Sequence, residues 1–153
     1  MNGTVVAICV AGAANEPMRE VSEVEAIAGQ GLKGDRYATG EGSFNRNKQG
    51  ARQVTLMNAG HFPGSGFNYA DSRRNIFTQD VELMRLIGRE FQIGKVLFRG
   101  VKYCEPCRKP SKLAGIERKF SEAFFDKGGL IAEVVEGGII RVGAIVVPPP
   151  KGY

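Results

Sequence analysis

The sequence predicts one domain over residues 1–153 that is mainly β with a few helices and folds as a closed or nearly closed β-barrel. Three observations predict this fold class. Short stretches rich in β-branched residues dominate the chain. Only two segments have a helical spacing of apolar residues. No linker, internal repeat or change in composition divides the chain into parts. Many short strands in one small domain favour a barrel over an open sheet.

The strand pattern occurs in six segments. The segment 90–104 is expected to hold two strands with a break near Gly94. The segment 129–147 is expected to hold two strands around Gly137 and Gly138, a spacing typical of a hairpin. The other four segments are 4–11, 19–28, 52–57 and 74–78.

Two segments, 79–88 and 116–128, have the spacing of an amphipathic helix and end at glycine. The apolar side chains expected on their buried faces are Leu83, Met84 and Ile87 in the first and Phe120, Phe124 and Phe125 in the second.

Two polar, glycine-containing segments, 39–51 and 61–72, are long for loops in a domain of this size. Long loops on a rigid scaffold often carry binding residues. The second contains His61, the only histidine, for which a loop or helix-start role is favoured over catalysis.

The glycines of the stretch AGQGLKGDR match a dinucleotide-binding fingerprint at Gly29, Gly31 and Gly34. That motif requires a helix directly after it and an acidic residue about twenty positions further on. The segment that follows has no helical apolar face, and the acidic residue is missing. A tight turn after a strand is therefore predicted, and nicotinamide dinucleotide binding is rejected.

The composition indicates a protein without a membrane span or a signal peptide, and a cytoplasmic location is expected. The net charge of +5 is compatible with nucleic acid or with a small anionic ligand. No polybasic run or row of stacking aromatic residues is present, so nucleic-acid binding is not expected. Three cysteines argue against a disulfide framework and fit a reducing compartment.

The stretch GVKYCEPCRKPSK contains a C-x-x-C pair, Cys104 and Cys107. Structural zinc would need further ligands, and only Cys9 and His61 remain. A thioredoxin-like pair would need a βαβ frame. A single reactive thiolate is favoured, because nearby basic residues, Arg108 among them, lower the pKa of a thiol. An inert, packed pair remains the alternative.

A second basic cluster is formed by Arg73, Arg74 and Asn75. A guanidinium and an amide side by side can bind a phosphate or a pterin-like heterocycle. Arg36 and Arg52 are further candidates, and each of these arginines could instead be a solvated surface charge.

Five motifs in this order resemble the MOSC family, named after the C-terminal domain of molybdenum-cofactor sulfurases. The resemblance covers roughly residues 29–147. The motifs are Gly34-Asp35-Arg36-Tyr37, RQVTL, RRNIFTQDVELMRLIGREFQIGKVLF, CEPC and GGIIRVGAIVV.

The resemblance implies a β-barrel-like MOSC fold, similar to the pyruvate-kinase β-barrel. It implies that Cys107 holds sulfur as a persulfide or ligates molybdenum. It also implies that Arg73 and Asn75, as the family's Arg-x-Asn motif, contact the phosphate and pterin of the molybdenum cofactor. Cys104 has no general counterpart in the family. The sulfurtransferase domain that uses pyridoxal phosphate in full sulfurases is not found in this sequence.

The leading hypothesis is therefore a sulfur carrier or a molybdenum-cofactor-binding protein, and a role in sulfur transfer or in a molybdenum-dependent reductase is left open. Cys107 and Cys104 are the candidate catalytic residues, and Cys107 is the candidate metal ligand. A cysteine desulfurase or a redox protein is the expected partner, and no membrane or nucleic-acid partner is expected. The alternative is a non-catalytic module that recruits a sulfurtransferase or oxidoreductase. The candidate cofactor-binding residues are Arg36, Arg52, Arg73, Asn75 and Arg108.

Overall fold

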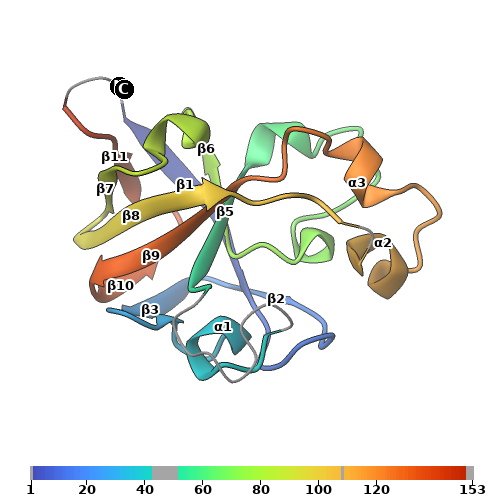
Figure 1. The fold of residues 1–153 in the computed structure, drawn as a ribbon, viewed down its shortest axis with the longest axis horizontal. Coiled ribbons are helices and arrows are strands. Elements are labelled where there is room, and N and C mark those ends of the chain that lie inside the picture. The colour runs from blue at the N-terminus through green and yellow to red at the C-terminus, as the bar shows by residue number, and fades with distance from the viewer. Residues whose placement is uncertain (1, 43–51, 108, 151–153) are drawn as a thin grey trace.

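A computed structural model describes residues 2–42, 52–107 and 109–150, and its main feature is a closed seven-stranded barrel. The strand order around the barrel is β11-β7-β8-β9-β5-β6-β1, and β1 pairs with β11 to close it (Figure 1). All neighbouring strands are antiparallel except β5 and β6, which are parallel. The mainly β, barrel-like fold predicted from the sequence is thus confirmed. The strands are β1 (Gly3–Val10), β5 (Val54–Asn58), β6 (Ile76–Gln79), β7 (Glu90–Ile93), β8 (Val96–Tyr103), β9 (Leu130–Glu136) and β11 (Ile145–Val147).

The barrel interior is filled by aliphatic and phenylalanine side chains that all seven strands contribute. Successive residues of a strand point to opposite faces, so neighbours in β5 and β6 separate. Leu56 and Ile76 enter this interior cluster, whereas Met57 and Phe77 join a second cluster on the outer face. The barrel is therefore packed with side chains on its inside and leaves one outer face to be covered by other elements.

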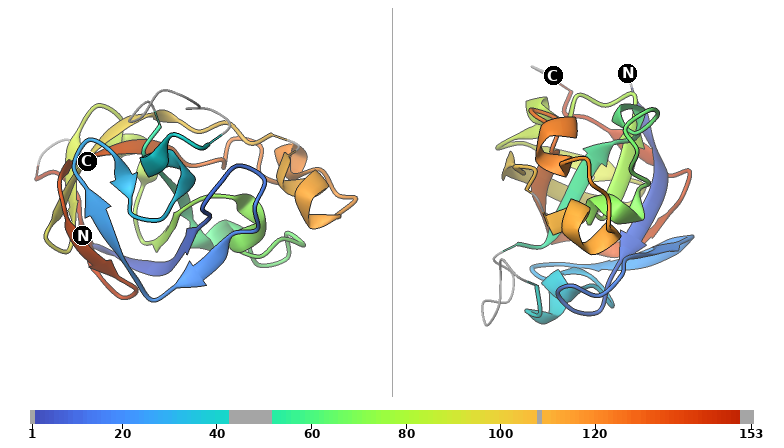
Figure 2. Two further views of the ribbon diagram at one scale, coloured as in Figure 1. Left: turned by 90° about the horizontal axis from the view of Figure 1, so that it is seen from below. Right: turned by 90° about the vertical axis from the view of Figure 1, so that its right-hand side faces the viewer.

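The second cluster is aromatic and lies between the outer face of β1, β5 and β6 and the helical segments. Phe62 and Phe124 meet there with ring centroids 4.9 Å apart, and Phe120 and Phe124 stack at 4.5 Å. The helices α2 (Lys109–Ala114) and α3 (Phe120–Ala123) lie together over this end of the molecule (Figures 1 and 2). Three short 3-10 turns lie between strands: η1 (Ala59–His61), η2 (Ala70–Ser72) and η3 (Leu83–Leu86).

A separate three-stranded sheet is formed by β10 (Gly138–Arg141), β3 (Glu23–Ile27) and β4 (Gly31–Leu32), while β2 (Arg19–Val21) extends the barrel sheet beside β1. The segment predicted as one strand over 19–28 is thus two strands that belong to different sheets.

The tight turn that the sequence predicts after a strand is present: Gly29 lies in the turn between β3 and β4, Gly31 begins β4, and Gly34 follows β4. All three have positive φ, and a Cβ at Gly31 would lie 2.5 Å from the carbonyl oxygen of Gln53. Contrary to expectation, a helix does follow them, but α1 (Arg36–Thr39) is a single turn capped by Asp35.

The predicted helix over 79–88 is wrong. β6 continues to Gln79, Asp80 has a positive φ of 63°, and only the 3-10 turn η3 follows. Met84 and Ile87 are exposed, and Leu86 is buried in their place. The apolar spacing matched a helix, but the strained residue and the barrel contacts decide the backbone here.

The second predicted helix, over 116–128, shortens to the four residues of α3. Phe120 and Phe124 are buried as predicted, but Phe125 is 71% exposed. The predicted hairpin around Gly137 and Gly138 is also wrong, because β9 pairs with β8 and β5, whereas β10 pairs with β3. The two glycines carry the chain from one sheet to the other, and a Cβ at Gly137 would lie 2.5 Å from the carbonyl oxygen of Ala26.

Among the described residues, none of the helices is long and apolar enough to span a bilayer.

Candidate functional site

The cysteine pair lies on the segment that leads from the end of β8 to α2. Cys104 is buried, and its backbone N–H donates to the carbonyl of Gly129 at 2.9 Å. Cys107 is partly exposed and belongs to no helix or strand. The two thiols therefore differ: the first is enclosed, and the second is open to solvent.

The path of this segment depends on two glycines that precede β9. A Cβ on Gly128 would collide with the carbonyl oxygen of Cys104 and with Pro106, and one on Gly129 would collide with the carbonyl oxygen of Leu56. The cysteine segment therefore packs directly against the backbone at Gly128. Any residue with a Cβ at this position would force the cysteine segment to move.

Arg73 begins the basic cluster in a left-handed conformation, with φ 61° and ψ 26°. Its Nη1 donates to the carbonyl oxygen of Glu16 at 2.6 Å. Its Nη2 is buried and has no hydrogen-bond partner among the described residues. Burial lowers the pKa of Arg73, and the nearby Arg36 guanidinium adds to this effect, while Tyr37 and Asp35 oppose it.

Arg74 is buried and connects three separate parts of the chain through backbone carbonyls. Its Nε donates to Gly128 at 2.9 Å, its Nη1 to Ser72 at 3.3 Å and its Nη2 to Glu105 at 3.2 Å. It also lies over the ring of Phe120 at 5.7 Å. No carboxylate neutralises it among these contacts, so it fixes the cysteine segment and still adds positive charge.

Asn75 is fully buried, and its side chain forms hydrogen bonds to two strands of the barrel. Its Oδ1 accepts from the N–H and the hydroxyl of Thr55, and its Nδ2 donates to the carbonyl oxygen of Cys9 at 3.1 Å. These bonds join β5 to β1 next to the parallel pair β5–β6. Asn75 does not line the pocket described below.

Arg36 is the one buried arginine of this group that is paired with a carboxylate. Its Nη1 donates to Asp35 Oδ1 at 3.0 Å, and its Nη2 donates to the hydroxyl of Tyr37 at 3.1 Å and to the carbonyl oxygen of Arg73 at 3.0 Å. The same Asp35 oxygen accepts the backbone N–H of Ala11 at 3.1 Å. Arg36 thus holds the backbone of Arg73 in place.

Arg52 is partly buried and lies on the barrel side of the cluster. Its Nη1 donates to Cys104 Sγ at 3.8 Å, and its guanidinium lies 5.9 Å from the centre of the Tyr37 ring. Arg108, the remaining candidate from the sequence, lies outside the described residues.

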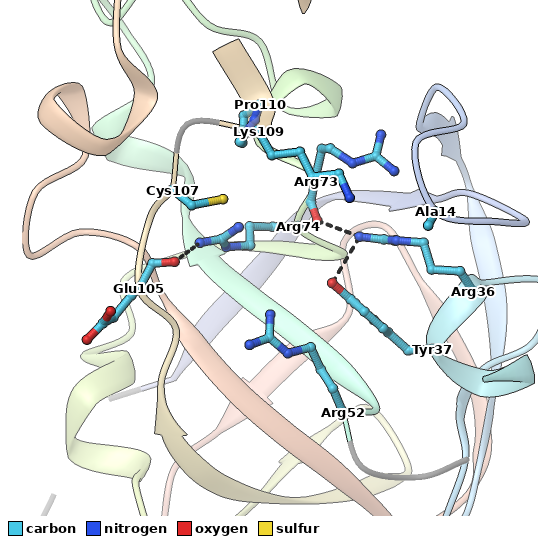
Figure 3. Close-up of a pocket in the computed structure, with 10 residues that line it drawn as sticks. All are labelled: Ala14, Arg36, Tyr37, Arg52, Arg73, Arg74, Glu105, Cys107, Lys109 and Pro110. Atoms are coloured by element: carbon cyan, nitrogen blue, oxygen red, sulfur yellow. Dashed lines mark hydrogen bonds between the residues drawn. The ribbon is translucent and has the colours of Figure 1, made fainter. Parts of the chain in front are cut away.

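These side chains line a narrow hollow of about 30 Å³, into which the Cys107 sulfur points toward the arginines (Figure 3). Five of its ten lining residues are cationic, and its single carboxylate, that of Glu105, points away from them (Figure 3). Lys109 is one of the basic residues that the sequence places near the cysteine pair, whereas the sequence did not single out Tyr37 and Pro110 for this site. We call this hollow the cysteine pocket; its lining residues are Ala14, Arg36, Tyr37, Arg52, Arg73, Arg74, Glu105, Cys107, Lys109 and Pro110.

The other candidates lie elsewhere. Cys9 is buried in the aromatic cluster, where burial first and the charge of Glu20 second raise its pKa to about 12. His61 lines a different hollow with Glu82 and Lys127, and burial together with Lys127 lowers its pKa. Within residues 2–42, 52–107 and 109–150, no three His, Cys, Asp or Glu side chains gather as a metal site.

Three solved structures share this fold. YuaD of Bacillus subtilis superposes with a TM-score of 0.78 over 95% of this chain and 94% of its own, at 13% identity. YiiM of Geobacillus stearothermophilus gives 0.69 over 99% and 77%, at 17% identity. YiiM of Escherichia coli gives 0.65 over 98% and 71%, at 16% identity. At these identities the likeness concerns the fold alone.

A comparison with curated protein sequences gives no match. The family model of the MOSC domain, however, matches residues 51–147, which is well over half of the chain. The match includes the basic cluster, the cysteine pair and the last strand, all of which the sequence resemblance also contained. The chain belongs to the MOSC domain family.

Proposed function

We propose that the cysteine pocket binds the molybdenum cofactor, with the Cys107 thiolate as a ligand of the metal and the arginines around the anionic part. The observation that carries this proposal is the presence of a solvent-accessible thiol and a buried, unpartnered guanidinium N–H on the lining of one pocket. A buried donor without a partner is unfavourable by about 1–3 kcal/mol, which a bound acceptor would recover.

The donor set suits such a group. Thiolate sulfur is a soft ligand, and guanidinium groups form paired hydrogen bonds to phosphate oxygens. Arg73 would bind the phosphate through Nη2, and Arg52, Arg74 and Lys109 would add positive charge around it. When bound, the cofactor would supply a metal centre capable of changing its oxidation state.

The protein's own residues have three tasks in this proposal. Cys107 loses its thiol proton to solvent when it ligates the metal, because only the thiolate binds. Arg74 keeps the cysteine segment at a fixed place by its bond to the carbonyl of Glu105. Arg36 keeps Arg73 in its left-handed conformation by its bond to the Arg73 carbonyl.

A second candidate function is sulfur carriage, which the neighbouring thiol of Cys104 and its contact with Arg52 favour. The Cys107 thiolate would attack the outer sulfur of a persulfide R–S–SH on a donor protein, such as a cysteine desulfurase. The S–S bond of the donor breaks, a persulfide forms on Cys107, and the donor leaves as the thiolate R–S⁻. A reducing, cytoplasmic setting would keep both thiols available.

The test compares Cys107→Ser with Cys104→Ser, both purified gently from a molybdate-supplied host. Elemental analysis for molybdenum and intact mass for an adduct of about 32 Da, one sulfur atom, are measured on each variant and on the parent. Cofactor binding predicts molybdenum in the parent and in Cys104→Ser but not in Cys107→Ser. Sulfur carriage predicts the mass adduct with the same dependence on Cys107. Loading of Cys107→Ser at the level of the parent would refute a role for this thiol.

A further inference from the structure

A second hollow, of about 150 Å³, adjoins the cysteine pocket and shares Arg73 and Pro110 with it. It lies where α2 and η2 meet the loop that precedes β2, and we call it the side pocket. Its lining residues are Asn15, Pro17, Met18, Ala70, Asp71, Arg73, Pro110, Leu113 and Ala114.

The walls of the side pocket are mostly apolar. Six of its nine lining residues are proline, alanine, methionine or leucine, and Leu113 presents its side chain from α2 while remaining 44% exposed. Of the two polar residues besides Arg73, Asp71 already accepts the N–H of Asn68 at 2.9 Å. The side pocket therefore combines an apolar surface with one carboxylate, that of Asp71, and one strong hydrogen-bond donor.

That donor is Arg73 Nη2. The residue is 8% exposed, its Nη1 is already engaged by Glu16, and its backbone is held by Arg36. The guanidinium therefore has little freedom to turn toward another protein acceptor. Nη2 is buried and has no partner within the described residues, and Arg73 lines both pockets.

We propose that the side pocket binds the hydrocarbon part of a small organic carboxylate, whose charged group pairs with Arg73 at the boundary facing Cys107. The ligand class is thus an acid with a short aliphatic body, which would compete with the cofactor phosphate for the Nη2 of Arg73. The binding itself requires neither the cofactor nor the thiol.

The test measures dissociation constants of butyrate, hexanoate and 1-hexanol by calorimetry or ligand-observed NMR on the reduced protein. Burial of two more methylenes predicts that hexanoate binds about tenfold more tightly than butyrate. Loss of the charge predicts that 1-hexanol binds at least about tenfold more weakly than hexanoate. Equal affinity of the two acids, or of acid and alcohol, would overturn the proposal.

Two variants locate the site. Leu113→Asp should abolish the preference for hexanoate, whereas Val142→Asp, equally exposed at 45% but outside both pockets, should keep it. Arg73→Met should weaken hexanoate about tenfold or more and leave 1-hexanol unchanged. An unchanged preference in Leu113→Asp would refute the side pocket even if Arg73→Met failed to fold.

Cys107→Ser separates this inference from the proposed function. The variant should bind hexanoate as the parent does and should lose only molybdenum or sulfur loading. If it loads normally while hexanoate binding persists, the proposed function fails and the side pocket stands. If loading depends on Cys107 but the acids show no chain-length preference, the side pocket alone is refuted.

Discussion

Two neighbouring sites contain buried arginines, Arg36 in the first and Arg73 with Arg74 in the second. The partners of their guanidinium groups differ. Arg36 pairs with the fully buried carboxylate of Asp35, whereas Arg73 and Arg74 are held by backbone carbonyl oxygens alone. A carboxylate cancels a charge, while a carbonyl dipole only orients it. The comparison teaches that the charge of the first site is neutralised within the fold, whereas no carboxylate is bonded to the guanidinium groups of the second.

The largest expected effect comes from breaking the neutralised site. Asp35→Ala leaves the Arg36 charge buried and removes the acceptor of the Ala11 N–H. We expect the free energy of unfolding to fall by about 3–5 kcal/mol, measured by denaturant titration. Glu90→Ala, which breaks an exposed pair with Arg99, serves as the control and should lose less than about 1 kcal/mol. A similar loss in both variants would contradict a structural role for Asp35.

A smaller loss is expected at the site held by carbonyls. Arg74→Met removes three hydrogen bonds but leaves no charge without its partner. We expect a loss of about 2–3 kcal/mol, together with a changed rate of alkylation of Cys107, because Glu105 is no longer tied. The difference between the losses of unfolding free energy in Arg74→Met and Asp35→Ala measures the contribution of charge neutralisation to stability. An alkylation rate equal to that of the parent would show that Arg74 does not fix the position of the cysteine segment.

The third test uses the charge that Arg73 retains. Inorganic phosphate at ten times its dissociation constant should raise the free energy of unfolding by about 1.4 kcal/mol. Arg73→Met should show almost none of this gain. Arg99→Met, which changes an exposed arginine far from the pocket, should keep it in full. Phosphate stabilisation of equal size in both variants would place the anion elsewhere.

The smallest expected effect concerns the thiol that the chain buries among aromatic side chains. Burial raises the pKa of Cys9 from 9.0 to about 12, so the folded state keeps the proton that the unfolded chain releases. The stabilising effect is complete below pH 9 and is lost as the pH rises toward 12. Between pH 9 and 10 the parent should therefore lose about 1 kcal/mol more than Cys9→Ala in denaturant titrations. Parallel losses in the two proteins would refute this linkage.

The barrel was predictable because its strands are short, β-branched and separated by glycine. The segment 79–88 was not, since its apolar spacing is that of a helix and only the backbone of Asp80 and the packing of Leu86 decide otherwise. Pairing of distant strands also escaped prediction, as the transfer of the chain between sheets at Gly137 shows.

The sequence predicted which residue types form the site, but not the hydrogen bonds that connect them. Cys107, Arg36, Arg52 and Arg73 meet in one pocket, although they come from four separate segments of the chain. The sequence contains no signal that Asn75 turns inward to bind Thr55 and Cys9. Such bonds depend on which strands are neighbours in the fold. Composition and local residue spacing do not determine that arrangement.

The seam between β1 and β11 has a consequence for how the protein is synthesised. Gly3 pairs with Val146, so the barrel joins two strands that are far apart in the sequence. A ribosome exposes the first strand long before its partner exists, and closing so long a loop is slow. Until β11 has been made, the edges of β1 and β7 that it covers lack their partner strand. Unpaired strand edges promote aggregation, so a chain that ends before residue 145 is expected to aggregate more readily.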